Sequence, residues 1–204
     1  MTARSSPYPP AGYPVRIGEL IWKNALATVR SYAELGGEDA RRGSETLVYL
    51  GGITAGGEMI VTGLFQVHHA PQGDRVVVAP HEARWLLQAL RTRDEKLIAQ
   101  LHSHRWLAEH SHGDDIWATS FHEGFLSIVV PNFGSGVRGP GDCGVLEYRN
   151  GTFVDLPRAE IERRIRVYSE TTERVGLPAV PAPATEGRWR AFARKLKSIA
   201  PKRR

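Results

Sequence analysis

Cysteine is almost absent from this chain of 204 residues, in which Cys143 is the single example. One thiol cannot form an intramolecular disulfide, and it cannot supply the ligands of a multi-cysteine zinc finger. Long apolar runs are also missing. The longest runs are short, such as residues 126–131, whereas a transmembrane helix needs about 18 or more apolar residues. The first 14 residues contain no apolar core of the kind found in secretory signal peptides. We therefore expect a cytoplasmic protein without a membrane span.

Acidic residues are missing from residues 188–204, where the positive charge of the chain is concentrated. Eight of the 27 lysine and arginine residues lie there, so residues 1–187 carry 19 basic against 22 acidic side chains. The net charge of +5 therefore does not predict a nucleic-acid-binding domain. The tail itself predicts a short basic amphipathic helix, which could bind an acidic partner, a nucleic acid or a membrane surface, or could be only a solvated terminus. Its apolar positions fall at helical spacing, at Trp189, Phe192, Leu196 and Ile199.

Proline and glycine divide the rest of the chain. Residues 1–15 are rich in proline and predict a disordered arm, and residues 175–187 predict an extended Pro/Ala linker before the tail. Residues 16–174 have the length of one folded domain. Their patterns predict helices over 18–35, 80–93 and 158–173, and strands over 46–53, 59–67, 74–79, 97–101, 125–131, 143–148 and 152–156, with a hairpin at Asn150-Gly151. Because helices and strands do not alternate strictly, we expect a mixed α/β (α+β) fold and not a Rossmann sheet.

Five of the eight histidines fall within 21 residues, and two of them, His102 and His104, follow the strand predicted over 97–101. Alternate residues of a strand point to the same face, so these two imidazoles can converge on one metal ion. A carboxylate about ten residues later can supply a third ligand, and two histidines with one carboxylate and an open fourth position are typical of catalytic zinc. His-x-His alone is weak evidence, because histidines in polar loops are usually solvated or hydrogen-bonded to the backbone.

A wider set of residues resembles the JAMM, or MPN-plus (JAB-domain), metallopeptidases, and in particular bacterial members. Their pattern is a glutamate on an early strand, then His-x-His, seven residues, serine, two residues and aspartate. The segment ETLVYLGG at 45–52 is similar to the family segment Glu-x-x-Gly-x-Leu-x-Gly, with Val48 in place of the first glycine. The segment GFLSIVVP at 124–131 is similar to the strand that follows the metal loop. The resemblance covers about residues 16–172 and implies a central mixed sheet flanked by helices.

The resemblance also implies a set of site residues. It implies that one zinc ion per chain is bound by His102, His104 and Asp114, that Glu45 is the general base and acid, and that Ser111 donates to the developing oxyanion. The loop departs from the pattern, because Ser111 follows His104 after six residues instead of seven, which makes Asp115 a rival ligand. Proline often occupies the position of Arg105 in the family. We prefer Ser111 with Asp114, because a deletion in a loop is tolerated more readily than loss of the serine hydroxyl.

The remaining cysteine and histidine residues are not expected to bind the metal ion. Cys143 begins a predicted strand and is expected to be buried, not nucleophilic. Two histidines are expected to line the loop or a substrate channel, His110 and His112. Four more are expected to be structural, His68, His69, His81 and His122.

The function implied by the resemblance is zinc-assisted hydrolysis of a peptide or isopeptide bond after the C-terminus of a ubiquitin-like protein. Either deconjugation or precursor processing would fit, and the modifier is not encoded in any motif. Bacterial members often act beside E1-like and E2-like proteins in modification operons, including anti-phage defence systems, so such proteins are the expected partners. The alternative is a catalytically inactive MPN scaffold. Such scaffolds usually lack the histidine or aspartate ligands, which this chain retains.

Overall fold

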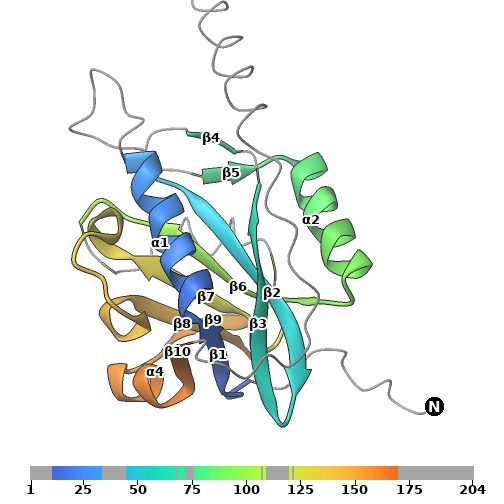
Figure 1. Cartoon of the computed structure of the whole chain (residues 1–204), viewed down its shortest axis with the longest axis vertical. Helices are drawn as coiled ribbons and strands as arrows, with labels where there is room; N and C mark the ends of the chain where they lie inside the picture. Colours follow the sequence, from blue (N-terminus) through green and yellow to red (C-terminus); the bar gives the residue numbers. More distant parts are fainter. Residues whose placement is uncertain are drawn as a thin grey trace, which may run out of the picture. The chain divides into compact units, whose positions relative to one another are not determined.

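The computed structural model of the chain describes residues 11–33, 45–67, 69–71, 76–106, 108, 120 and 122–169. A mixed sheet of eight strands, in the order β10-β1-β3-β2-β6-β7-β8-β9, organises this part of the chain, and β4 and β5 form a separate two-stranded sheet (Figure 1). The fold is therefore of the mixed α/β class, as expected. The strands are β1 (Val15–Gly18), β2 (Leu47–Ala55), β3 (Glu58–Gln66), β4 (His69–Pro71), β5 (Val76–Val78), β6 (Lys96–Ser103), β7 (Leu126–Val130), β8 (Gly144–Arg149), β9 (Thr152–Asp155) and β10 (Ile165–Tyr168). The helices are α1 (Glu19–Ala33), α2 (Pro80–Thr92) and α4 (Arg158–Arg164), with short 3-10 turns η2 (Pro131–Gly134) and η3 (Pro140–Asp142).

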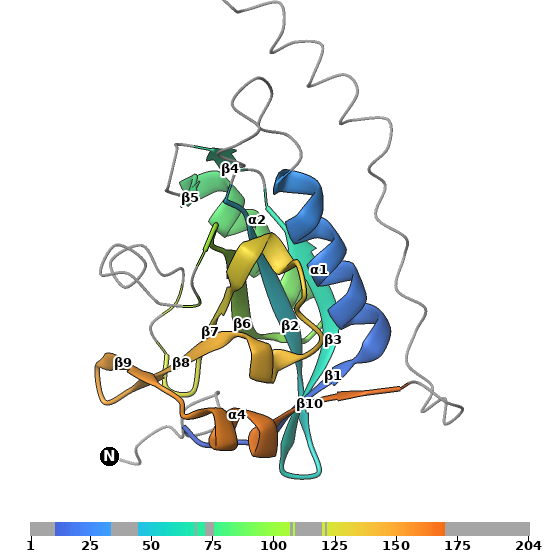
Figure 2. The same cartoon turned by 90° about the vertical axis from the view of Figure 1, so that its left-hand side faces the viewer.

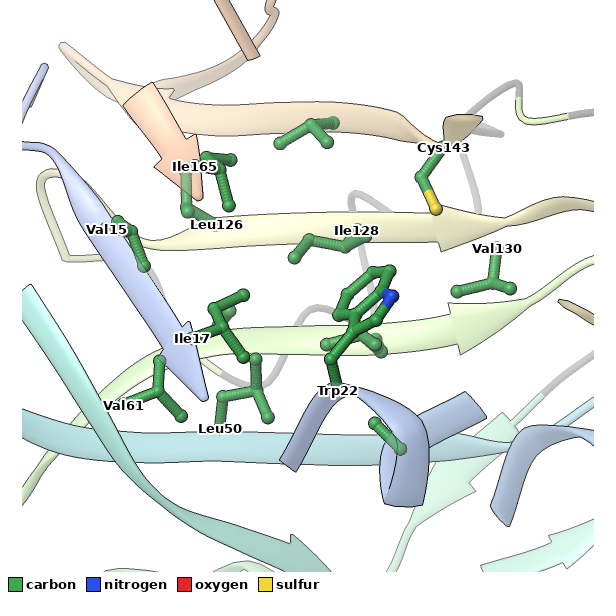
Figure 3. Packing of buried hydrophobic residues seen from close by; sticks show 14 of the residues in the cluster. Val15, Ile17, Trp22, Leu50, Val61, Leu126, Ile128, Val130, Cys143 and Ile165 are labelled. Carbon is green, nitrogen blue, oxygen red and sulfur yellow. The ribbon is translucent and has the colours of Figure 1, made fainter. Parts of the chain in front are cut away.

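Strand β2 lies at the centre of the sheet and is buried on both faces. Val48 and Leu50 belong to the apolar cluster that contains the inner face of α1. Leu47 and Tyr49 belong to a second cluster, which contains the inner face of α2. Because successive residues of a strand point to opposite faces, the sheet separates α1 from α2 (Figures 1 and 2). Figure 3 shows the α1 side, where Trp22 lies among the branched side chains of the sheet.

Most of the predicted elements are confirmed with shifts of one or two residues at their ends. The hairpin between β8 and β9 turns at Asn150 and Gly151, whose φ angles are 50° and 87°. Positive φ at both central residues is the requirement of a type I′ turn, and Asn-Gly is the pair that meets it most easily. Helix α2 begins at Pro80, as predicted, because proline is well suited to the first turn of a helix.

The helix predicted over 158–173 is wrong in its second half. Helix α4 ends at Arg164, and the chain continues as strand β10, which pairs in parallel with β1. Ile165 lies opposite Val15 in this pairing, and both side chains are buried. Strands β1 and β4 were also not predicted. A parallel pairing between segments 150 positions apart leaves no periodic signal in either segment, whereas the charged residues around α4 continue a helical pattern.

Several sequence predictions lie outside the described residues. These are most of the proline-rich arm at 1–15, the linker at 175–187 and the basic helix at 188–204. Among the helices that the structure describes, none combines the length and the apolar character that crossing a membrane requires.

Candidate metal centre

The two histidines of the His-x-His motif lie at the end of β6. His102 is in the strand and is 6% exposed, and His104 follows the strand and is half-buried. Leu101 belongs to the cluster under α1, so His102 points to the opposite face, as alternation requires. The two imidazole rings are side by side, with centroids 5.0 Å apart and planes inclined by 59°. The two imidazoles therefore lie next to each other, and their role as metal ligands stays a prediction.

The separation of the two rings fits a shared metal ion. With a Zn–N distance of about 2.1 Å, each ring centre lies about 3.2 Å from the ion, so two rings on a tetrahedral ion have centres about 5 Å apart. The 5.0 Å between His102 and His104 meets this value without any movement of the strand. Neutral imidazole nitrogen is also a ligand that zinc prefers. The described donor set therefore suits a zinc ion.

The start of β2, which Glu45 and Thr46 precede, lies beside the end of β6. Strands β2 and β6 are antiparallel, with Leu47 opposite His102. One residue further along, the amide of Ser103 donates to the carbonyl oxygen of Thr46, and the amide of Thr46 donates to Ser103 Oγ, both at 3.0 Å. Continued by one residue beyond the ends of both strands, this register would set Glu45 opposite His104, and directly opposite residues project from the same face of a sheet. A place for the Glu45 carboxylate beside the histidine pair stays a prediction.

Hydrogen bonds hold both the amide and the carbonyl group of His104. Its amide donates to the carbonyl oxygen of Val130 at 2.9 Å, and its carbonyl accepts from the amide of Phe133 at 3.0 Å. These bonds connect the end of β6 to the end of β7 and to η2. Because the backbone at this position is fixed, the imidazole is presented from a rigid support and not from a free loop.

The loop between β6 and β7 carries the rest of the predicted site. Ser111, Asp114 and the rival ligand Asp115 lie outside the described residues, as do His110 and His112. Within the ranges that the structure does describe, no three histidine, cysteine, aspartate or glutamate side chains are grouped so that they could hold a metal ion by themselves. Two adjacent imidazoles are what the described part of the chain supplies.

Cys143 takes no part in this centre. Its side chain points into the cluster under α1 (Figure 3), on the face of the sheet opposite to His102. Burial, with a smaller effect from the charge of Asp142, raises the pKa of the Cys143 thiol to about 12. The thiol therefore stays protonated at neutral pH and is a poor nucleophile, as expected.

His122 has the structural role expected of it. It precedes β7, whereas His102 lies near the end of β6, and the two strands are parallel. The imidazole of His122 is therefore at the other end of the sheet. It is hydrogen-bonded to Ser120 Oγ at 2.6 Å and to the backbone of Leu97. Burial lowers the pKa of His122 to about 4.

Sequence reasoning missed two features of the site. The first is Ser103, whose hydroxyl connects the two strands that carry Glu45 and His104. Its position between the two histidines was a usable signal, because the middle residue of His-x-His must point to the opposite face, where a polar group needs a partner. The second is Trp106, which is 66% exposed and lies against the guanidinium of Arg105 at 4.8 Å.

Comparison with known proteins gives a partial relative and a shared fold. No family model matches the chain. The chain is 38% identical over 98 residues to a protein of Sinorhizobium fredii described as probable metalloprotease y4jG, a match that covers 46% of this chain and 59% of that protein. The chain thus matches less than two thirds of the length of this relative. Protein DSY2949 of Desulfitobacterium hafniense, whose solution structure is known, is similar in fold, with a TM-score of 0.54, 16% identity, and coverage of 76% of this chain and 94% of that one.

Proposed function

We propose that the chain is a metal-dependent peptidase of the JAMM type. The observation that carries this proposal is the adjacency of the His102 and His104 imidazoles at the end of β6, with ring centroids 5.0 Å apart. Two histidines with a carboxylate as third ligand and an open fourth position are typical of catalytic zinc, and the open position allows metal-assisted hydrolysis. The partial relative described as a probable metalloprotease supports a metal-dependent peptidase in general, and the JAMM type rests on the resemblance of residues 16–172.

Each residue has a defined role in the proposed reaction. Zinc bound by His102, His104 and Asp114 would supply Lewis acidity that lowers the pKa of water and polarises a carbonyl group. Glu45 accepts the proton of the attacking water and then delivers it to the departing amine, so that water is added across the C–N bond. Ser111 donates a hydrogen bond to the oxygen that becomes negative in the transition state.

We propose as the substrate a peptide or isopeptide bond after the C-terminus of a ubiquitin-like protein. This substrate class comes from the resemblance of residues 16–172 to the JAMM peptidases. Either trimming of a precursor or removal of a conjugate would follow from the same chemistry. E1-like and E2-like proteins are then the proposed partners, in a bacterial modification or defence system.

Metal content and cleavage test the proposal together. The full chain is expected to bind about one zinc ion, and His104→Ala and Asp114→Ala are each expected to lose it. Retention of zinc in Asp114→Ala, with loss in Asp115→Ala, would move the third ligand by one residue and leave the peptidase unchanged. Cleavage is followed with a fluorogenic isopeptide of ubiquitin and, in parallel, with labelled casein.

The two substrates separate the parts of the proposal. Cleavage of the ubiquitin isopeptide, abolished by removal of zinc, supports the full proposal. Cleavage of casein alone would keep the metal-dependent peptidase and reject the substrate class. A parent protein that binds no zinc after reconstitution and cleaves neither substrate would contradict the proposal and favour the MPN scaffold.

A further inference from the structure

We propose that Arg30 of α1 is a positioning residue for His104, because it holds the turn η2 that fixes the backbone of this candidate ligand. Helix α1 lies on the face of the sheet opposite to His102, since its inner face belongs to the cluster that contains Leu101. Arg30 therefore acts on His104 through the backbone and does not touch the face that carries the imidazoles. The inference rests on the proposed function for the role of His104, and the contacts that carry it all join residues that the structure describes.

The turn η2 contains three consecutive residues in the left-handed region. Asn132 and Phe133 have φ and ψ angles of 50° and 35° and of 50° and 33°, and Gly134 has a φ of 80°. Glycine adopts this region without strain and asparagine tolerates it, whereas a bulky residue such as Phe133 is an outlier there. Residues in such conformations persist only where the surrounding structure holds them, and they are frequent at functional sites.

The turn and the end of β6 are joined at His104. The amide of His104 donates to the carbonyl oxygen of Val130 at 2.9 Å, and the carbonyl oxygen of His104 accepts from the amide of Phe133 at 3.0 Å. Val130 immediately precedes η2, so one short segment supplies both partners. A return of Phe133 to the usual negative φ would change the direction of the chain at this point and break its bond to His104. The support of His104 therefore depends on the strained turn being kept.

Arg30 holds the turn from the side of α1. Its Nε and Nη2 atoms donate to the carbonyl oxygen of Gly134 at 3.1 and 2.8 Å. The same oxygen accepts from the amide of Val137 at 3.4 Å, which is a longer bond from an uncharged donor. Hydrogen bonds from an ionised donor are roughly twice as strong as those between neutral groups, so the guanidinium is the stronger support. A connected set of hydrogen bonds thus runs from α1 through η2 to His104.

Helix α1 gives Arg30 a fixed starting point. Arg30 is in the last turn of the helix and follows Val29, which is completely buried in the cluster under α1. Ala25 and Leu26, one turn earlier, are buried in the same cluster. Because regular elements place a functional group more precisely than loops do, the guanidinium passes the fixed position of α1 to a turn that strain would otherwise loosen.

The first test compares Arg30→Met with Lys23→Met in the full chain. Lys23 lies on the same helix, is exposed, and forms its ion pair with Glu19 and not with η2. Amide hydrogen exchange is followed at Phe133, with Leu101 in β6 as the internal reference. We expect Arg30→Met to speed exchange at Phe133 by about tenfold or more, the ratio that loss of a hydrogen bond to a charged group implies, and to leave Leu101 unchanged. Lys23→Met should match the parent at both positions.

A second readout follows the imidazole of His104 itself. Its ring lies 5.0 Å from that of His102, so the ring protons of the two residues should give a nuclear Overhauser effect in the parent. Arg30→Met should weaken this effect, and Arg30→Lys, which keeps a charged donor, should restore part of it. In the isopeptide assay, Arg30→Met should lower kcat with little change in KM, because Arg30 lies away from the face that would meet substrate.

A third measurement needs no variant. The Nε proton of Arg30 should exchange with water more slowly than that of Arg138, whose side chain is 91% exposed. Equal exchange of these two protons in the parent would overturn the inference. It would also be overturned if Arg30→Met kept the parent's exchange at Phe133 and its ring contact, or if exchange at Leu101 rose equally, which would indicate a general loss of stability.

Failure of this inference and failure of the proposed function can be told apart. A parent that binds no zinc would contradict the proposed function, whereas the amide exchange and the ring contact would still decide whether Arg30 positions His104. A parent that binds zinc and cleaves the isopeptide, combined with an Arg30→Met variant that matches it in exchange, ring contact and kcat, would keep the proposed function and reject the role of Arg30.

Discussion

Thr46 and Ser103 hold each other through two hydrogen bonds of 3.0 Å, one between backbone groups and one from the Thr46 amide to the serine hydroxyl. Both residues are completely buried. The residue before Thr46 is Glu45, and the residue after Ser103 is His104. This pair of hydrogen bonds therefore joins the segment that carries the proposed general base to the segment that carries a proposed metal ligand.

The first prediction concerns Ser103→Ala. The substitution leaves the buried amide of Thr46 without its acceptor, which costs about 1–3 kcal/mol of unfolding free energy. The substitution also removes one of the hydrogen bonds that hold the start of β2 against β6. We therefore expect the rate of substrate cleavage to fall by more than the decrease in the amount of folded protein would cause. Urea denaturation and kcat of the remaining folded enzyme measure the two effects separately.

Ser127→Ala is the matched control for Ser103→Ala. Ser127 is equally buried and accepts a hydrogen bond of 3.0 Å from Gln100 Nε2, but it lies further from the end of β6. We expect it to lower stability without changing kcat. Equal effects of the two substitutions on kcat would show that Ser103 has no special role at the site.

The second prediction concerns Glu45→Gln. Glutamine keeps the shape of the side chain but cannot take up a proton, so zinc content should be unchanged while kcat falls by about 10²–10⁴-fold. The control is Glu58→Gln, because Glu58 forms an exposed ion pair with Arg16 on the hairpin between β2 and β3. Activity of Glu45→Gln near that of the parent would remove Glu45 from the mechanism.

The features that the sequence predicted correctly depend on residues that lie close together in the chain. The spacing of His102 and His104 is a local property of a strand, and the structure places their rings on one face. The Asn150-Gly151 hairpin and α2 are local as well. Strand β10 was missed, because its partner β1 is far away in the chain.

Contacts that depend on strand register could not be predicted from the residues near them in the sequence. The position of Leu47 opposite His102 follows from the pairing of β2 with β6, and the sequence placed Glu45 near the histidines only through the resemblance to a family. The close approach of Ala108 to Gly144 could not be predicted either, because a glycine in a strand indicates a bulge or a close backbone approach but does not identify the segment that approaches. The roles of Ser111 and Asp114 stay predictions.

The third prediction concerns pH. The pKa of His122 is lowered by burial to about 4 from its ordinary 6.5, so between these values the unfolded chain binds a proton that the folded chain does not. This contribution to stability is therefore complete above pH 6.5 and is lost as the pH falls towards 4, by on the order of 3 kcal/mol. The variant His122→Asn should lose less stability over this range than the parent. His81→Asn, at an exposed position, should follow the parent curve.

A cluster of buried charges joins three segments at the end of the sheet away from the metal centre. The carboxylate of Glu147 accepts hydrogen bonds from both terminal nitrogens of Arg164 at 2.7 and 3.0 Å, from Arg149, and from the amide of Gly12 at 2.9 Å. Arg164 also donates to the carbonyl oxygen of Tyr13 at 3.1 Å. Arg164 is the last residue of α4, so the cluster holds the point at which that helix gives way to β10.

The last prediction follows from this cluster. Burial alone would raise the pKa of Glu147, but its hydrogen bonds from Arg164 and Gly12 outweigh burial and lower the pKa below 4.5. Glu147 therefore stabilises the fold fully above pH 4.5, and this contribution is lost as the pH falls through the lowered value. Glu147→Ala leaves the buried guanidinium of Arg164 with the carboxylate of Glu160 as its remaining ion-pair partner, which should cost at most about 3–5 kcal/mol of unfolding free energy at neutral pH. The exposed pair of Arg158 and Glu162 provides the control, since Glu162→Ala should cost at most about 1 kcal/mol. Similar costs for the two variants in urea denaturation would mean that burial of the Glu147 cluster adds nothing to the stability of the α4–β10 junction.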